Sequence, residues 1–227
     1  MTETEERLLD AALTHVPFDG WSEATLARAA RDADVSKAEA RALFPRGAVD
    51  LALAFHRRGD AQMAERLSGM ALADMRFRDR VAEAIWIRLE VIPDREAVRR
   101  GTTLFALPQY SADGAKALWG TADRIWTALG DRSDDINWYT KRATLAGVYG
   151  STVLYWLGDD SYEGQDTRAF IDRRIEDVMR IEKAKAAVRA NPVLRTVSAG
   201  PLWALSKVRA PARMPKVDLP GRWRGKR

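Results

Sequence analysis

The chain of 227 residues has no cysteine and only two histidines. Without cysteine it forms no disulfide and offers no thiolate as a nucleophile or metal ligand, which agrees with a reducing compartment. The histidines, His15 and His56, lie far apart, outside any H-E-x-x-H type of metal spacing. There is no G-x-S-x-G, P-loop or G-x-G-x-x-G motif, and the acidic pairs at 134–135 and 159–160 fall at helix boundaries, where capping explains them. The sequence therefore predicts a binding protein, not an enzyme, with no catalytic residue, no metal and no cofactor.

Long uncharged hydrophobic runs are also missing. No stretch reaches the roughly 18 apolar residues of a membrane-spanning helix. The acidic N-terminus, MTETEERLLDAAL, lacks the apolar centre of a secretory signal. We therefore expect a cytoplasmic protein that does not cross a membrane.

Acidic charge is nearly absent from the C-terminal segment. After Glu182 there are twelve Lys and Arg residues and one acid, Asp218, whereas the residues up to Glu182 hold 25 bases and 31 acids. A basic tail on a mildly acidic body argues against a surface that is basic all round.

The tail, residues 191–227, combines this charge with prolines and with apolar residues at steps of three and four. A basic amphipathic segment with a tryptophan is typical of a helix that lies on a membrane surface. We predict that it holds the protein peripherally on the inner face of the membrane, at an anionic lipid surface. The predicted membrane-binding residues are Leu194, Val197, Trp203, Leu205, Lys207, Val208 and Arg209.

Apolar residues recur at three and four positions over most of residues 1–190, and no alternating pattern competes, so the sequence predicts an all-α fold. The first helix is expected to end before Pro17, and Ser22 is expected to cap the second. Ser36 and Glu39 form a capping box that begins the third. Longer helices are predicted from about Ala48 and at about 77–92, 95–107, 113–129, 136–157 and 163–189.

The first three helices form a predicted helix-turn-helix over residues 1–46, and a larger helical domain follows over 47–190. This arrangement resembles the TetR family of ligand-controlled repressors. However, the third helix, SKAEARALF, has no Asn, Gln, Tyr or Thr to contact a base edge, and Asp32 and Asp34 beside it repel phosphate. We predict a TetR-like bundle that does not bind nucleic acid. A TetR-type transcriptional regulator with an apolar effector stays the alternative.

Residues 134–157, DDINWYTKRATLAGVYGSTVLYWL, place five aromatic residues on one helix. Trp138, Leu145 and Tyr149 share a face, whereas Tyr139 lies about a hundred degrees round the helix. The helix is therefore covered on more than one side. One side can close on the bundle while the other faces a ligand cavity or a partner, or the whole helix can be buried; periodicity leaves both open.

The segment DRSDDINWYTKRATLAGVY resembles the corresponding stretch of the ubiquinone-biosynthesis accessory lipid-binding proteins, the ninth of the Coq proteins. The resemblance covers roughly residues 5–182, and the basic tail is not a close match. It implies a TetR-like fold without DNA binding, a homodimer, and a cavity in the 47–190 domain for an isoprenoid quinone lipid or a phospholipid. It also implies assistance to the hydroxylase that acts on demethoxyubiquinone. Further matching stretches, in the same order, are LDAALTHVPFDGW at 9–21, residues 88–93, 107–108, 123–126 and 130–131.

The same resemblance implies particular site residues. Matching the motif position by position, the patch that would bind the hydroxylase is Asp135, Asn137, Trp138, Tyr139, Lys141 and Arg142. An isoprenoid chain leaves a bilayer only for an equally apolar cavity, because each buried CH₂ contributes about 0.8 kcal/mol. The residues expected to bind lipid, which periodicity does not separate from core, are Ile85, Leu89, Leu118, Ile125, Leu145 and Val148.

Overall fold

The structure is a computed structural model that describes residues 1–190 and 209–211. Regular structure within these residues is helical throughout, which confirms the predicted all-α fold. The helices are α1 (Glu3–Asp19), α2 (Glu23–Asp32), α3 (Lys37–Leu43), α4 (Ala48–Ser68), α5 (Phe77–Glu90), α6 (Arg95–Phe105), α7 (Ser111–Ala128), α8 (Ile136–Trp156) and α9 (Gln165–Ala190), with short 3-10 turns η1 (Leu72–Asp74) and η2 (Tyr162–Gly164).

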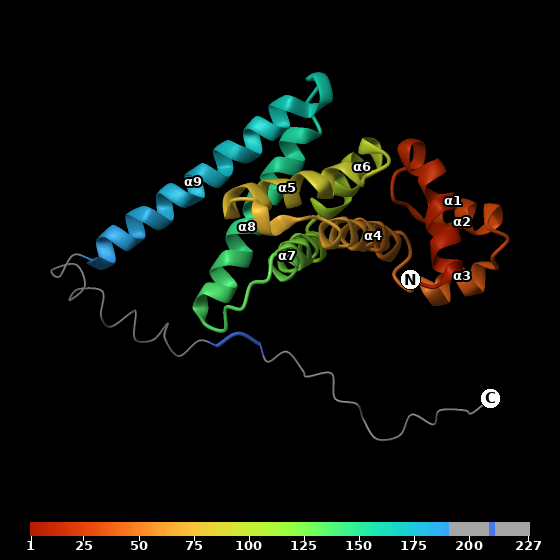
Figure 1. The fold of residues 1–227 in the computed structure, drawn as a ribbon. Helices are drawn as coiled ribbons and strands as arrows, with labels where there is room; N and C mark the ends of the chain where they lie inside the picture. The colour runs from red at the N-terminus through yellow and green to blue at the C-terminus, as the bar shows by residue number, and fades with distance from the viewer. Residues whose placement is uncertain (191–208, 212–227) are drawn as a thin grey trace, which may run out of the picture.

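Helices α1 to α3 form a unit at one end of the molecule (Figure 1). Each begins at a residue whose side chain accepts a backbone hydrogen bond: Thr2, Ser22 and Ser36. Such caps satisfy N–H groups that have no partner within the helix. The apolar faces of these helices and of the start of α4 bury one core, which includes Leu8, Val16 and many alanines.

The first helix does not end before Pro17, as the sequence predicted, but continues to Asp19. Proline removes one backbone donor, and here the loss falls in the last turn. The N–H of Gly20 still donates to the carbonyl of Val16 at 2.9 Å, so the final turn closes past the proline. Gly20 has φ of 66°, a conformation that favours glycine at a helix end.

The remaining helices enclose a second core. Helices α7 and α8 pack together, and α9 lies along α8 at the edge of the molecule (Figure 1). Ile85, Leu89, Ile125 and Leu145 are at most 4% exposed in this core. Burial of each such side chain contributes about 1.5–3 kcal/mol, so these contacts dominate the stability of the larger domain.

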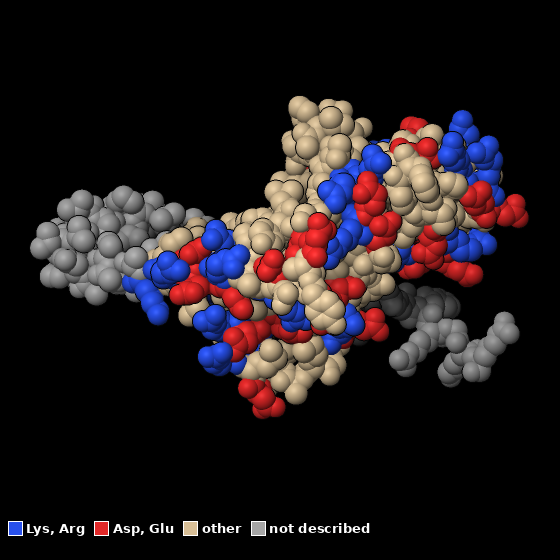
Figure 2. Space-filling view, turned by 90° about the horizontal axis from the view of Figure 1, so that it is seen from above, with Lys and Arg blue, Asp and Glu red and all other residues tan. Residues whose placement is uncertain are grey.

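Charged side chains of both signs are mixed over most of the face seen in Figure 2, and one projection on that face carries none. A face with such mixed charge does not by itself create the single-sign potential with which a protein attracts nucleic acid over a distance. Among the described residues, no helix is both long and apolar enough to span a bilayer.

Candidate functional site

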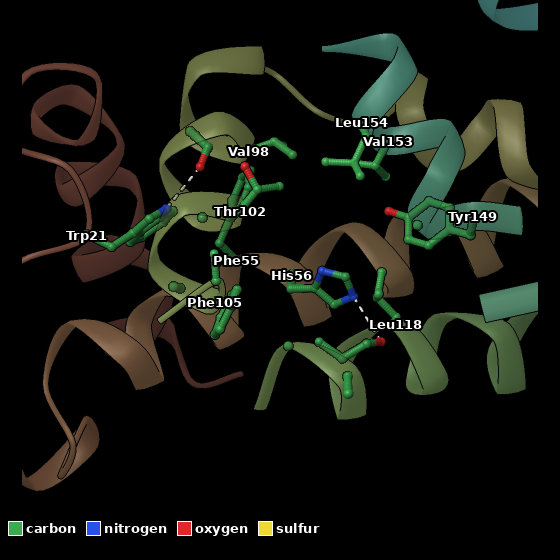
Figure 3. A pocket seen from close by; sticks show the side chains of 18 of the residues that line it. Trp21, Phe55, His56, Val98, Thr102, Phe105, Leu118, Tyr149, Val153 and Leu154 are labelled. Carbon is green, nitrogen blue, oxygen red and sulfur yellow. Dashed lines mark hydrogen bonds between the residues drawn. The ribbon is translucent and has the colours of Figure 1, made fainter. Parts of the chain in front are cut away.

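A cavity of about 450 Å³ lies where α4, α6, α7 and α8 meet, and Trp21 borders it from the N-terminal unit (Figure 3). Its wall is mainly apolar, with Phe55, Phe105 and Val153 among its side chains. Ligand cavities in proteins typically measure roughly 300–1,000 Å³ and have such walls. Leu154 also belongs to the wall and is 66% exposed, so the cavity reaches the surface.

Glycines on α7 and α8 make room for the side chains that line this cavity. Gly114 passes so close to α6 that a Cβ there would lie 2.8 Å from Phe105 Cβ, and a Cβ on Gly150 would lie 3.2 Å from Leu118 Cδ1. Side chains at these positions would force their neighbours to move. The glycines therefore let aromatic and aliphatic side chains, rather than backbone, shape the wall.

One part of the wall is polar, and a buried ion pair supports it. Arg88 of α5 donates from Nε to Asp60 Oδ1 at 2.7 Å, and the hydroxyl of Thr121 donates to the same oxygen at 2.8 Å. Arg88 and Asp60 are each 3% exposed. Because the two charges compensate each other in this pair, the polar wall carries little net charge.

His56 stands in the same wall and is uncharged at neutral pH. Burial lowers the pKa of its imidazole, the positive charge of Arg88 lowers it further, and the value falls to about 4. Nε2 lies 2.8 Å from Thr121 Oγ1 and 3.2 Å from the carbonyl of Ala117. A carbonyl only accepts, so this network assigns the proton to Nε2 and leaves Nδ1 as an acceptor.

The expected lipid-binding residues divide between cavity and core. Of the six, Leu118 lies in the cavity wall. The other five, Ile85, Leu89, Ile125, Leu145 and Val148, belong to the buried core around α5, α7 and α8 instead. The predicted helices α5, α7 and α8 all contribute to the wall of this cavity, but the prediction included neither α4 nor α6 and named few of the wall residues, because core and cavity residues share the same apolar spacing. His56, Arg88 and Tyr149 were missed as wall residues; the His56–Asp60 spacing of one helical turn was the available signal.

A second candidate site is the start of α8, where aromatic residues gather. The Trp138 ring lies 5.8 Å from that of Trp119 and 4.8 Å from that of Tyr139, measured between centroids. Asp135 caps the helix by accepting from the backbone and side-chain nitrogens of Asn137 at 2.9 and 2.8 Å. Four residues of the predicted hydroxylase patch thus lie together, and each is at least partly exposed to solvent: Asp135, Asn137, Trp138 and Tyr139.

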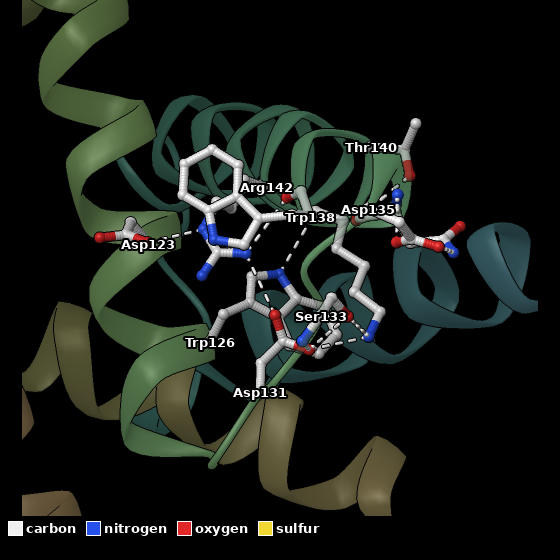
Figure 4. A network of polar contacts seen from close by, with 10 residues as sticks. Asp123, Trp126, Asp131, Ser133, Asp135, Trp138, Thr140 and Arg142 are labelled. Carbon is white, nitrogen blue, oxygen red and sulfur yellow. Dashed lines mark hydrogen bonds and ion pairs between the residues drawn. The ribbon is translucent and has the colours of Figure 1, made fainter. Parts of the chain in front are cut away.

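Arg142 differs from the expected patch because its side chain is fully buried. It donates to Asp123 at 2.6 Å and to Asp131 at 3.1 Å, and its guanidinium lies 4.0 Å from the centroid of the Trp138 ring (Figure 4). As placed, it has no surface to present to a partner. The structure corrects its role from a contact residue to one that joins the start of α8 to α7 and to the loop before α8.

Lys141, another member of the predicted patch, is paired within the protein, although its side chain is 38% exposed. Its ammonium donates to Asp131 at 2.8 Å and to Ser133 at 2.7 Å. Burial raises the pKa of Asp131, but hydrogen bonds from Lys141, Ser133 and Arg142 outweigh it and lower the pKa to about 2. Asp131 is therefore ionised at every pH at which the protein is ordinarily studied.

Residues 209–211 lie against the same surface. The hydroxyl of Tyr139 donates to the carbonyl of Arg209 at 3.3 Å, and the N–H of Ala210 donates to the carbonyl of Asp134 at 2.9 Å. A partner that binds at Tyr139 would meet this segment. Arg209 is exposed, and the other predicted membrane-binding residues, at 194–208, lie outside the described part of the chain.

Two arginines at the end of the helix-turn-helix are paired with acids. Arg41 of α3 donates to Glu23 at 2.6 Å, and Arg46 binds both Asp50 and Asp113 at 2.8 and 3.0 Å. These exposed pairs lower the positive charge available for phosphate contacts, which disfavours the DNA-binding alternative. No cluster of metal-ligating side chains occurs within the described residues.

Comparison with known proteins identifies relatives for most of the chain. Residues 111–182 match the family model described as COQ9. The rat "Ubiquinone biosynthesis protein COQ9, mitochondrial" is 32% identical over 196 residues, which are 83% of this chain and 62% of that protein. The human protein of the same name is 30% identical over 196 residues, 83% of this chain and 61% of that protein. The chain thus spans about three fifths of the length of these curated relatives.

A solved structure resembles the fold. A TetR transcriptional regulator from Nitrosomonas europaea superposes with a TM-score of 0.62 and 19% sequence identity, over 77% of this chain and 97% of that one. At this identity the likeness concerns the fold alone. It confirms the predicted TetR-like arrangement of the helices.

Proposed function

We propose that the chain, whose sequence is similar to that of COQ9 proteins over most of its length, acts in ubiquinone biosynthesis as a non-enzymatic lipid-binding protein. In this proposal it holds an isoprenoid quinone intermediate, or a phospholipid, in its cavity. At a membrane surface it presents the intermediate to a hydroxylase of the demethoxyubiquinone type. It requires no cofactor of its own.

The observation that carries this proposal is the apolar cavity beside α4 and α6 to α8. Moving an isoprenoid chain from a bilayer into water costs about 0.8 kcal/mol of free energy per CH₂, so a carrier must give the chain an equally apolar surface. Wall residues such as Phe55, Phe105, Leu118 and Val153 supply that surface.

We also propose that the protein forms a homodimer through the outer faces of α8 and α9. Large apolar side chains are exposed there, including Leu154 at 66%, Met179 at 41% and Ile181 at 54%. A set of exposed apolar side chains on neighbouring helices marks an interaction surface. The basic tail completes the proposal by holding the dimer at an anionic membrane surface.

Blocking the cavity is expected to remove the lipid. Ala115 of α7 is exposed and belongs to the cavity wall, whereas Ala112, one turn earlier, is exposed and does not. In Ala115→Trp the indole occupies cavity space, so mass spectrometry of organic extracts should find at least fivefold less isoprenoid lipid or phospholipid per chain than in the original protein. Ala112→Trp is the matched control and should keep its lipid. Extracts of the original protein that contain no lipid would contradict the proposal.

The patch at the start of α8 predicts a loss of partner affinity. Tyr139→Ala should weaken binding to the hydroxylase about 30-fold, since a central aromatic contact contributes about 2 kcal/mol. The helical content should not change, because Tyr139 is only partly buried. The control is Tyr162→Ala, at a tyrosine that is 76% exposed on η2. Equal affinities of both variants, measured by calorimetry, would rule out the patch.

A further inference from the structure

Tyr149 of α8 directs its hydroxyl into the cavity and is only 2% exposed (Figure 3). Its ring lies beside the buried ion pair, with Arg88 Cζ 5.8 Å from the ring centroid. The nearby polar groups of His56, Arg88 and Asp60 all make hydrogen bonds. The Tyr149 hydroxyl makes none with any residue that the structure describes. Because the ring is packed in the core and the hydroxyl opens into the cavity, a ligand atom in the cavity can complete its hydrogen bonding.

The electrostatics of the wall restrict what that atom can be. Burial raises the pKa of Tyr149, so the hydroxyl stays protonated and can donate a hydrogen bond. His56 is neutral, and the charge of Arg88 is already compensated by Asp60. An anionic ligand would find no unpaired cation in this wall and would lose its hydration. A pure hydrocarbon would leave the hydroxyl without a partner.

We propose that Tyr149 is a specificity-determining residue of the cavity, whose hydroxyl donates a hydrogen bond to an uncharged oxygen, a quinone carbonyl or aryl ether, of an otherwise apolar ligand. This inference rests on the proposed function and deepens it. The apolar wall holds the body of the molecule without regard to its chemistry, and Tyr149 distinguishes an oxygenated ring from a hydrocarbon or a fatty acid. A site that hydrogen-bonds one ligand group discriminates strongly against analogues that lack it.

Three probes with the same ten-carbon prenyl chain test this inference. Geranyl-1,4-benzoquinone has the neutral acceptor oxygen, geranylbenzene lacks it, and geranic acid has no ring and carries a carboxylate at the first carbon of the ten-carbon chain. Affinities are measured by calorimetry on the lipid-extracted full chain. We expect the quinone to bind most tightly. In Tyr149→Phe its affinity should fall about 3- to 10-fold, the effect of one neutral hydrogen bond, while that for geranylbenzene should stay the same or rise.

Two controls separate this effect from a change in folding. Tyr155→Phe alters a tyrosine of the same helix that stacks on Phe170 outside the cavity, and it should leave all three affinities unchanged. Since the Tyr149 hydroxyl has no protein partner, lipid-free Tyr149→Phe should unfold at the same temperature as the original protein or at a higher one.

The outcomes distinguish this inference from the proposed function. If Ala115→Trp abolishes binding of every probe but Tyr149→Phe changes none, the cavity binds lipid and the role of Tyr149 is wrong. The role is also wrong if geranic acid binds more tightly than the quinone. If no probe binds the original protein and no lipid co-purifies, both the inference and the proposed function fail.

Discussion

Arg142→Met is expected to lower the free energy of unfolding by about 3–5 kcal/mol, the usual effect of removing one partner from a buried ion pair. Arg142 is fully buried, and it binds Asp131, whose side chain is 4% exposed. Methionine keeps much of the apolar volume but leaves the Asp131 carboxylate with less compensation. The start of α8 also loses its connection to Asp123 on α7. Denaturant titration followed by circular dichroism measures the change.

The pH dependence of this effect follows from the pKa of Asp131, which is about 2 in the folded protein against an ordinary value of 3.8. A carboxyl whose pKa is lowered by folding stabilises the protein fully above its unfolded pKa, and this contribution is lost as the pH falls toward the folded value. Arg142→Met removes one of the groups that lower the pKa. The difference in stability between the variant and the original protein should therefore be largest at pH 7 and should narrow between about pH 4 and pH 2.

Arg124→Met is the matched control for this prediction. Arg124 is an exposed arginine of α7 next to Asp123, and surface substitutions usually change stability by no more than about 0.5 kcal/mol. If Arg142→Met proves as mild as Arg124→Met, Arg142 does not hold the start of α8. It would then be available for the partner contact that the family resemblance implied.

The sequence predicted the helices well because their ends depend on local chemistry. Ser22 and Ser36 cap helices as expected, and the helices expected at 77–92 and 136–157 are α5 (Phe77–Glu90) and α8 (Ile136–Trp156). Caps and proline act over a few residues, so a single sequence contains the necessary information. The first helix is the exception, because Pro17 cost one donor without ending the helix.

The candidate site was less predictable because burial depends on neighbours that are distant in sequence. Lys141 and Arg142 are adjacent bases in a polar motif, and the sequence favoured an exposed role for both. Arg142 is fully buried only because α7 packs against α8 and Asp131 lies between them. Likewise Leu118 and Ile125 share the apolar face of one helix, yet only Leu118 meets the cavity.

Tyr149 shows a second limit of prediction from sequence periodicity. Its spacing from Leu145 placed both residues on one face of the helix without deciding what that face meets, and both are buried in the structure. Periodicity gives the direction of a side chain but not what fills the space at its end. That required the positions of Arg88 and His56, which come from two other helices.

Arg88→Met is expected to be as destabilising as Arg142→Met, by about 3–5 kcal/mol, because it leaves the Asp60 carboxylate buried without its cation. The matched control is Arg66→Met, which removes the exposed pair of Arg66 with Glu90, whose side chains are 54% and 39% exposed. Exposed pairs contribute about 0–1 kcal/mol, so the control should change stability little. Equal effects of the two variants would show that the buried pair does not support the cavity wall.

Adding Asp60→Asn to Arg88→Met should recover much of the lost stability, since the double variant contains no unpaired buried charge. A double variant that is less stable than Arg88→Met alone would contradict the ion-pair explanation.

NMR titration of His56 gives an independent measurement of the charge of Arg88. In the original protein its pKa is held at about 4, mainly by burial and next by the charge of Arg88. In Arg88→Met, which removes this positive charge, the pKa of His56 should rise toward 6.5 without reaching it, because the imidazole stays buried.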